Sequence, residues 1–342
     1  MSADDDRNAL LAKALASVAD GASARWCGDG YRFSTVGGGT QATVWHGQPT
    51  QAEAPEVAVR LTPKPVELID RIARLIDAVD AVERPETLAV ARLQSGGRTW
   101  TVHVCTWIGK GTADRSDPYG LGQDIARLHQ QLARAGNDFA DRKLTFERGP
   151  VPPADQELPA WYVARHLWRD RIFPRFADHQ AQLRPQPIHG DLHWDNVVAG
   201  SSGGFGFIDF DKVMHAPPVF DLAKLIATGF FRISSSTGTA VFRQSRATDL
   251  LAGYQSIRPL SAAEIAALEG FALILNEETA RLGHLYDVAT YREQADAVGS
   301  WWTIRRRRKP SDPLGIRTAS RTPNAPPRPA VQQLPFFPDP NN

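Results

Sequence analysis

The octapeptide HGDLHWDN concentrates side chains that could bind a metal ion or move protons. Its two histidines and two aspartates alternate along the chain as His189, Asp191, His193 and Asp195. In a strand all four would lie on one face and could form the metal site of a hydrolase, because imidazole and carboxylate both bind divalent metals. In a loop this alternation has no spatial meaning, and Asp191 with Asn196 becomes the pair of chemical interest.

The residues after this segment favour the loop. They predict a β-hairpin in which NVV is the first strand, a Ser/Gly run is the turn and GFGFID is the second strand, ending at Asp209. Asp191 and Asn196 then follow the spacing D-x-x-x-x-N, with Asp209 thirteen residues further on. This is the spacing of a kinase catalytic loop and its second metal-binding aspartate. There, one carboxylate accepts the proton of the attacking hydroxyl, while amide and carboxylate oxygens hold Mg²⁺.

The stretches HGDLHWDNV, FIDFD and PVFDLAKL together closely resemble the aminoglycoside phosphotransferase and choline kinase-like family, a branch of the protein-kinase-like fold. The resemblance implies that Asp191 is the catalytic base, that Asn196 and Asp209 bind Mg²⁺, and that His189 shapes the loop. Asp221 resembles the aspartate with which family members brace the catalytic loop from a neighbouring helix. From the residues alone, Asp221 is equally well a helix N-cap.

An upstream segment, VGGGTQATVWHG, resembles the nucleotide loop of the same family. Glycine lets backbone N–H groups approach phosphate oxygens, although a glycine cluster between two strands can also be a simple turn. The candidate nucleotide-binding residues in this loop are Gly37, Gly38, Gly39 and Thr40.

The stretch VAVR falls where kinases have VAIK, so Arg60 replaces the usual lysine. Arginine also neutralises phosphate, but with a fork instead of a point charge. Its carboxylate partner on the following helix is open among Glu67, Asp70 and Asp77. The stretch VCTWIG resembles the hinge between the kinase lobes, which implies that backbone groups of Thr106 and Ile108 meet the adenine edge of ATP.

Hydrophobic periodicity supplies the elements that must position these residues. It predicts helices over 5–19, 66–79, 119–136 and about 160–178, and strands within 31–60 and over 87–94 and 98–108. The region 219–300 is predicted to be mostly helical, with Ser261 and Glu264 forming a capping box.

This order of elements predicts an α+β fold. With the resemblance, it indicates a bilobal protein-kinase-like fold: a small antiparallel β-sheet N-lobe with one main helix, and a larger, mostly helical C-lobe. The expected domains are an N-terminal helix (1–25), a nucleotide-binding N-lobe and hinge (26–108), a catalytic and acceptor-binding C-lobe (109–302), and a disordered tail rich in proline and arginine (303–342).

Composition limits the partners of the chain. A formal net charge of +1 over 342 residues gives no electrostatic case for nucleic-acid binding. Cys27 and Cys105 lie far apart and form no C-x-x-C motif, which favours a reducing compartment. The sequence contains neither a secretion signal at its start nor an apolar run of about 18 residues. We therefore expect a cytoplasmic monomer or homodimer without membrane contact.

The predicted function is transfer of the γ-phosphoryl group of ATP, with Mg²⁺, to a hydroxyl of a small molecule such as an aminoglycoside-like aminosugar or an amino alcohol. Glu277, Glu278 and Asp287 could face a cationic acceptor, although exposed acids on a helix are commoner. One alternative is a catalytically silent kinase-like protein that binds a nucleotide or metabolite. The metallohydrolase alternative is disfavoured because the remaining histidines are scattered and because it leaves VAVR and IDFD unexplained.

Overall fold

The computed structural model describes residues 3–19, 30–36, 42–51, 53–109, 113–136, 139, 141–142, 182–201, 203–233, 240–268, 270–272 and 275. The expected nucleotide loop residues Gly37, Gly38, Gly39 and Thr40 lie outside this set, as do the expected helix near 160–178, the acidic residues after 276 and the tail 303–342. Within the described ranges, no helix has the length and apolar character needed to span a bilayer.

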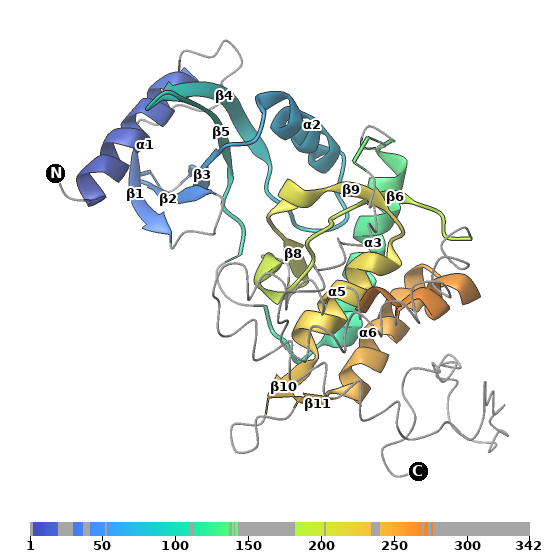
Figure 1. Cartoon of the computed structure of the whole chain (residues 1–342). Helices are drawn as coiled ribbons and strands as arrows, with labels where there is room; N and C mark the ends of the chain where they lie inside the picture. The colour runs from blue at the N-terminus through green and yellow to red at the C-terminus, as the bar shows by residue number, and fades with distance from the viewer. Residues whose placement is uncertain are drawn as a thin grey trace, which may run out of the picture.

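A five-stranded antiparallel sheet forms the smaller lobe, with the strand order β1-β2-β3-β5-β4 (Figure 1). Its strands are β1 (Tyr31–Val36), β2 (Thr43–Pro49), β3 (Val57–Thr62), β4 (Thr87–Ser95) and β5 (Arg98–Thr106). The β4–β5 hairpin closes through Gly96 and Gly97, whose φ angles of 60° and 71° fit a two-residue turn that glycine enters without strain. The sheet therefore follows the predicted strands closely.

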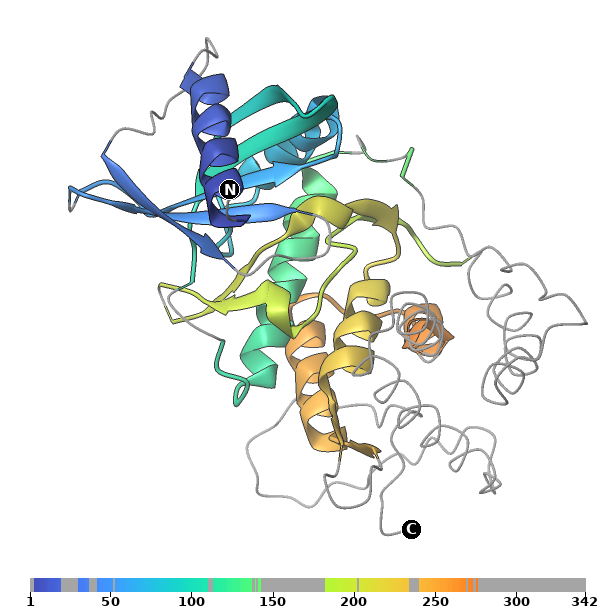
Figure 2. The same ribbon diagram turned by 60° about the vertical axis from the view of Figure 1, so that its left-hand side comes forward.

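Two helices flank this sheet, and each buries a different apolar stripe (Figure 2). Helix α1 (Ala3–Ala19) packs Leu11, Ala14 and Val18 against apolar side chains of the strands. Helix α2 (Val66–Asp77) contacts β4 and β5, but its buried isoleucines belong to the apolar core of the larger lobe. Helix α2 thus joins the two lobes physically.

The larger lobe is built around α3 (Pro118–Arg134), α5 (Val219–Gly229) and α6 (Gln244–Ile257). Short antiparallel strand pairs connect them: β6 (Gln186–Ile188) with β9 (Met214–Ala216), and β7 (Val197–Ala199) with β8 (Phe205–Phe207). The predicted α+β class and the two-lobe division into a sheet lobe and a mainly helical lobe agree with this arrangement (Figure 1).

The described residues after 219 are mostly helical, as predicted, but they include one strand pair that was not predicted. Strands β10 (Phe231–Ile233) and β11 (Ala240–Phe242) pair between α5 and α6. The rings of Phe231 and Phe242 lie 4.9 Å apart across this pair, so aromatic packing favours a strand where helical periodicity was expected. The predicted capping box is confirmed: Ser261 N donates to Glu264 Oε2 at 2.9 Å and Glu264 N to Ser261 Oγ at 3.2 Å.

Helices α3 and α6 approach closely because each has a glycine at the contact. A Cβ added at Gly122 would lie 2.0 Å from the carbonyl oxygen of Leu250, and one added at Gly253 would lie 1.9 Å from that of Tyr119. Both neighbours are backbone atoms, which cannot rotate away as a side chain would. These glycines therefore set the separation of the two helices.

We expect Gly122→Ala to lower the free energy of unfolding by about 1–3 kcal/mol, because the added methyl group overpacks a backbone contact. Urea denaturation of the purified protein measures this loss. Ala133→Ser, at an exposed position of the same helix, is the control and should change stability by no more than about 0.5 kcal/mol. Equal stability of the two variants would contradict the close helix contact.

Candidate functional site

The predicted hairpin brings Asn196 and Asp209 together. Strands β7 and β8 pair with Val197 opposite Phe207, so the residue before β7 lies near the residues after β8. A backbone hydrogen bond from Ile208 N to Asn196 O, 3.1 Å long, fixes this neighbourhood. Thirteen residues of separation in the sequence thus become direct proximity in space.

Asp209 has an unusual backbone conformation. Its φ of 61° and ψ of 57° place it in the left-handed region, the one non-glycine residue with positive φ in the described ranges. Such a conformation costs on the order of 1 kcal/mol or more and persists only where the surrounding structure enforces it, as at functional sites. It turns the chain sharply between β8 and the following turn.

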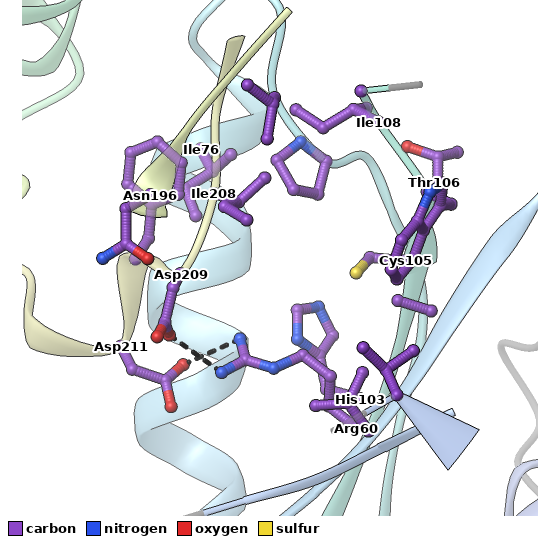
Figure 3. A pocket seen from close by; sticks show the side chains of 18 of the residues that line it. Arg60, Ile76, His103, Cys105, Thr106, Ile108, Asn196, Ile208, Asp209 and Asp211 are labelled. Atoms are coloured by element: carbon purple, nitrogen blue, oxygen red, sulfur yellow. Dashed lines mark hydrogen bonds and ion pairs between the residues drawn. The ribbon is translucent and has the colours of Figure 1, made fainter. Parts of the chain in front are cut away.

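Arg60 reaches from β3 across the cleft to two aspartates (Figure 3). Its Nη2 donates to Asp209 Oδ1 at 2.9 Å and its Nη1 to Asp211 Oδ1 at 3.1 Å. Lys64 Nζ lies 3.2 Å from the other oxygen of Asp211. Burial alone would lower the pKa of Arg60, but Asp211 and Asp209 outweigh it and raise that pKa above its ordinary value.

The expectation that Arg60 pairs with a carboxylate of helix α2 is therefore wrong. The three candidate carboxylates turn elsewhere: Glu67 pairs with Arg92 at 2.6 Å, Asp70 pairs with Arg74, and Asp77 Oδ1 lies 3.5 Å from Thr87 N. The arginine side chain is long enough to reach the segment after β8, where two partly buried carboxylates bind its fork more effectively than an exposed helix acid would.

Asp221, from helix α5, holds the loop that carries Asp191. Its carboxylate is fully buried and accepts hydrogen bonds from His189 N and Gly190 N, both at 2.9 Å. His129 Nε2 lies 3.1 Å from the same carboxylate, and His129 Nδ1 lies 2.9 Å from Tyr254 Oη. The network links α3, α5, α6 and the loop through His129, which is fully buried and hydrogen-bonded at both ring nitrogens.

The alternative role of Asp221 as a helix N-cap is not observed. Pro218 occupies the N-cap of α5, and no side chain caps this helix. Asp221 instead lies inside the first turn with its side chain directed at the loop amides. Of the two roles that the sequence left open for Asp221, the structure therefore favours bracing of the loop over capping of the helix.

His189 connects the loop to the chain after β8. Its Nε2 lies 2.9 Å from Ile208 O, its Nδ1 accepts from Asp191 N at 3.3 Å, and its ring packs 4.5 Å from that of Phe210. Gly190 has a φ of +78°, and a Cβ there would lie 2.2 Å from the carbonyl oxygen of Lys212. The loop conformation therefore depends on a glycine as well as on the histidine.

The alternating His/Asp residues do not form a metal cage. The ring of His189 is committed to a backbone carbonyl, and His193 Nε2 lies 3.2 Å from the side-chain amide of Asn196. The side chain of Asp195 is 85% exposed. Among the residues that the structure describes, no three His, Cys, Asp or Glu side chains gather as a metal-binding group. The loop geometry explains this, since it removes the period-two alternation of a strand.

Asp191 lies between two lysines. Lys224, one turn after Asp221 on α5, contacts Oδ1, and Lys212 Nζ lies 2.8 Å from Oδ2. Burial alone would raise the pKa of Asp191, but Lys224 and Lys212 together lower it well below its usual range. Asp191 is therefore an ionised carboxylate at any physiological pH.

A cavity of about 760 Å³ lies between the sheet and the β7–β8 hairpin, within the ~300–1,000 Å³ typical of small-molecule sites. Asn196, Asp209 and Asp211 line one side of it (Figure 3). The opposite side is lined by Cys105, Thr106 and Ile108, where the hinge was expected (Figure 3). The cavity thus has a charged side and, opposite it, a side formed by the end of β5 and the residues that follow.

Two titratable side chains of the β5 wall of the cavity, His103 and Cys105, are uncharged at neutral pH. Burial, together with nearby Arg60, lowers the pKa of His103 to about 4, and burial raises the pKa of the Cys105 thiol to about 11. Thr106 N is already bonded to Glu86 O at 2.9 Å, so this amide is not a donor for a ligand. A contact from Thr106 to a base would have to use its carbonyl oxygen or its side chain.

Asn196 and Asp209 suit a hard divalent cation. Asn196 Nδ2 donates to Asp191 O at 2.8 Å, which leaves the amide oxygen as the end available to a ligand. The side chain of Asp209 is 43% exposed, and both residues line the cavity. An amide oxygen beside a carboxylate is a donor set that Mg²⁺ accepts, so the residues fit the ion implied by the sequence.

Four charged residues of this site were not singled out from the sequence: Lys64, Asp211, Lys212 and Lys224. Asp211 could have been found, because FIDFD repeats an aspartate with period two after a strand. Lys224 follows Asp221 by three residues on a helix, which places both on one face. No signal in the sequence distinguishes Lys212 from an ordinary surface lysine.

The fold defined by this arrangement is that of the kinase-like phosphotransferases. An amicoumacin kinase solved in complex with AMP-PNP, Ca²⁺ and Ami superposes with a TM-score of 0.62 at 15% identity, covering 87% of this chain and 94% of that one. The choline kinase LicA from Streptococcus pneumoniae gives a TM-score of 0.50 at 16% identity, covering 79% and 93%. At such identities the likeness concerns the fold alone.

Residues 32–260 match the phosphotransferase enzyme family, and the chain belongs to that family. Curated relatives include the homoserine kinase of Hyphomonas neptunium, 31% identical over 162 residues, and that of Methylobacterium radiotolerans, 40% identical over 154 residues. These matches cover 45% and 43% of this chain, and 48% and 45% of the relatives. The chain thus matches about half the length of these relatives.

We expect Asp221→Asn to destabilise the protein by about 1–3 kcal/mol, because an NH₂ group would replace one of the two oxygens that accept from the buried loop amides. Thermal and urea unfolding measure the loss. Asp195→Asn, on the same loop but exposed, should leave stability within about 0.5 kcal/mol of the unmodified protein. An Asp221→Asn variant as stable as this control would show that the loop does not depend on the buried carboxylate.

A second expectation concerns pH. The folded-state pKa of Asp191 lies below the ~3.9 of an unfolded aspartate, so its ion pairs stabilise the fold above about pH 4 and lose this effect as the pH falls further. Lys224→Met should raise that pKa. The stability deficit of this variant, measured by urea unfolding, should be largest near pH 7 and shrink below pH ~4.

The control for this experiment is Lys224→Arg, which keeps the positive charge and should keep most of the pH-dependent difference. A deficit of Lys224→Met that is constant from pH 7 to pH 3 would mean that the lysine acts by packing and not by its charge on Asp191.

Proposed function

We propose that this protein is a phosphotransferase that moves the γ-phosphoryl group of ATP to a hydroxyl group of a small molecule. The observation that carries the proposal is the convergence of groups from both lobes on one site: Arg60, Asn196 and Asp209 line the cavity, and Asn196 donates a hydrogen bond to the carbonyl oxygen of Asp191. Phosphoryl transfer uses a carboxylate that receives the proton, two oxygen ligands for a metal ion and a positively charged side chain that binds phosphate. Membership of the phosphotransferase family supports the same reaction type.

In this proposal the nucleotide occupies the cavity, with its base toward the hinge and its phosphates toward Arg60. The uncharged wall of His103 and Cys105 suits a neutral heteroaromatic ring. Arg60 would bind phosphate oxygens, which requires it to exchange at least one of its aspartate partners for the nucleotide. Gly37, Gly38, Gly39 and Thr40 are proposed to cover the phosphates.

Asn196 and Asp209 are proposed to hold Mg²⁺, which when bound neutralises charge on the phosphate oxygens. Asp191 would orient the acceptor hydroxyl and receive its proton, because it is ionised and its carbonyl oxygen accepts a hydrogen bond from the side chain of Asn196, which keeps it beside the proposed cation site. His189 and Asp221 act on the reaction only through the loop: they fix its backbone and thereby the direction of the Asp191 carboxylate.

The proposed acceptor is a small molecule that carries a hydroxyl group, such as an aminosugar or an amino alcohol. The names of the curated relatives point to the second class, since homoserine is an amino alcohol that also carries a carboxylate. The two lysines that contact Asp191 bear on the choice between these classes.

We expect Asp191→Asn to lower kcat by roughly 10²- to 10⁴-fold while nucleotide affinity changes little, because the variant loses the proton acceptor but keeps the cavity. ADP release is measured with ATP, Mg²⁺ and a panel of amino alcohols, hydroxy acids and aminosugars. Asp249→Asn, at an exposed position of α6 that is not among the residues lining the cavity, is the control.

An Asp191→Asn variant with the turnover of the control would remove Asp191 from the role of base. ATP binding without any acceptor-stimulated turnover above that of the Asp191→Asn variant would instead favour the silent nucleotide-binding alternative.

A further inference from the structure

Asp191 is surrounded by an excess of positive charge. Its Oδ2 lies 2.8 Å from Lys212 Nζ and its Oδ1 contacts Lys224. A base needs one cation at most to keep it ionised, so the second ammonium is not explained by the proton transfer. The two lysines also differ: the side chain of Lys224 is 16% exposed and that of Lys212 is 49% exposed.

Lys224 is placed to be a fixed partner. It lies on α5, the helix that holds the catalytic loop through Asp221, and its ammonium is largely enclosed. Lys212 ends the short turn Phe210–Lys212 and reaches Asp191 from the solvent side. An ion pair whose cation is half exposed is weak, so the ammonium of Lys212 can exchange its partner readily.

Any acceptor must come close to Lys212. A hydroxyl that gives its proton to Asp191 lies about 3 Å from this carboxylate, whose Oδ2 is in contact with the Lys212 ammonium. A charged group a few bonds away from that hydroxyl is then within reach of the ammonium. The sign of the charge at position 212 therefore selects among acceptors.

Neighbouring acids do not cancel the excess. Asp209 and Asp211 are paired with Arg60, and Asp211 is paired with Lys64 as well. The nearest other acid of the loop, Asp195, is 85% exposed and faces His193. Among the described residues of the site, four cations face three carboxylates: Arg60, Lys64, Lys212 and Lys224 against Asp191, Asp209 and Asp211.

We propose that Lys212 binds a carboxylate of the acceptor and that the protein phosphorylates a small hydroxy acid or hydroxy amino acid, not a polycationic aminosugar. The proposal rests on the proposed phosphotransferase function and names its substrate class. Lys212 would leave Asp191 for the acceptor carboxylate while Lys224 keeps the base ionised. A polycation would instead meet two ammoniums at the reacting hydroxyl.

The test compares acceptors that differ by one charge. Turnover with ATP and Mg²⁺ is measured for L-homoserine, its carboxamide, 4-hydroxybutyrate and kanamycin, with the unmodified protein, Lys212→Met and Lys212→Glu. Binding of the same acceptors in the presence of AMP-PNP is measured by calorimetry, which needs no turnover. Lys13→Met, an exposed lysine of α1, is the matched control.

We expect the unmodified protein to favour homoserine over its carboxamide by about tenfold or more in kcat/KM, the effect of one charge-assisted hydrogen bond. In Lys212→Met this preference should fall to about threefold or less, mainly through a higher KM for homoserine. Lys212→Glu should reverse the preference, and Lys13→Met should leave it unchanged. Thermal unfolding checks that the variants are folded.

Two results would overturn the inference. One is a preference for kanamycin or the carboxamide in the unmodified protein, with Asp191-dependent turnover, which would leave the phosphotransferase function intact. The other is a preference for homoserine that survives both Lys212 substitutions. Carboxylate-selective binding that depends on Lys212 but gives no turnover would support the carboxylate site and refute the phosphotransferase function.

Discussion

The buried carboxylate of Asp221 is the interaction on which the rest of the site depends. It has no exposure to solvent, and its hydrogen bonds to His189 N and Gly190 N join helix α5 to the loop. A buried carboxylate is stable only when its oxygens are well satisfied, so the loop has few alternatives to the conformation that satisfies them. His129 and Tyr254 extend this constraint to α3 and α6, whose own separation is set by two glycines.

The cleft is electrostatically compensated across the two lobes. Arg60 comes from the sheet, whereas Asp209 and Asp211 come from the segment after β8, so these ion pairs connect the two lobes. Helix α2 adds an apolar link, since its buried isoleucines belong to the core of the larger lobe. A ligand with phosphates must therefore compete for a cation that is already paired, and a metal ion must compete for Asp209.

The spacing of residues in the sequence predicted which backbone segments lie side by side, but it did not predict which side chains pair. The β7–β8 hairpin follows from a turn between two short apolar runs, and it alone brings Asn196 to Asp209. The choice between a metal cage and a loop was also resolved correctly, because the hairpin and VAVR agreed with a single fold. The partners of Arg60 were missed because Asp211 lies 151 residues further along the sequence. The periodicity of a helix carries no information about a contact between such distant segments.

The position of Asp191 between two lysines raises a question of basicity. A carboxylate whose pKa is held well below its usual range is a weak base, so it cannot remove a hydroxyl proton before the phosphorus–oxygen bond begins to form. In a loose transition state for phosphoryl transfer the attacking hydroxyl keeps its proton until late, and orientation matters more than base strength. The same ammoniums that weaken Asp191 as a base keep it ionised and fixed in direction. The lysine pair is therefore compatible with the proposed transfer, provided that Lys224 stays in place while Lys212 meets the acceptor.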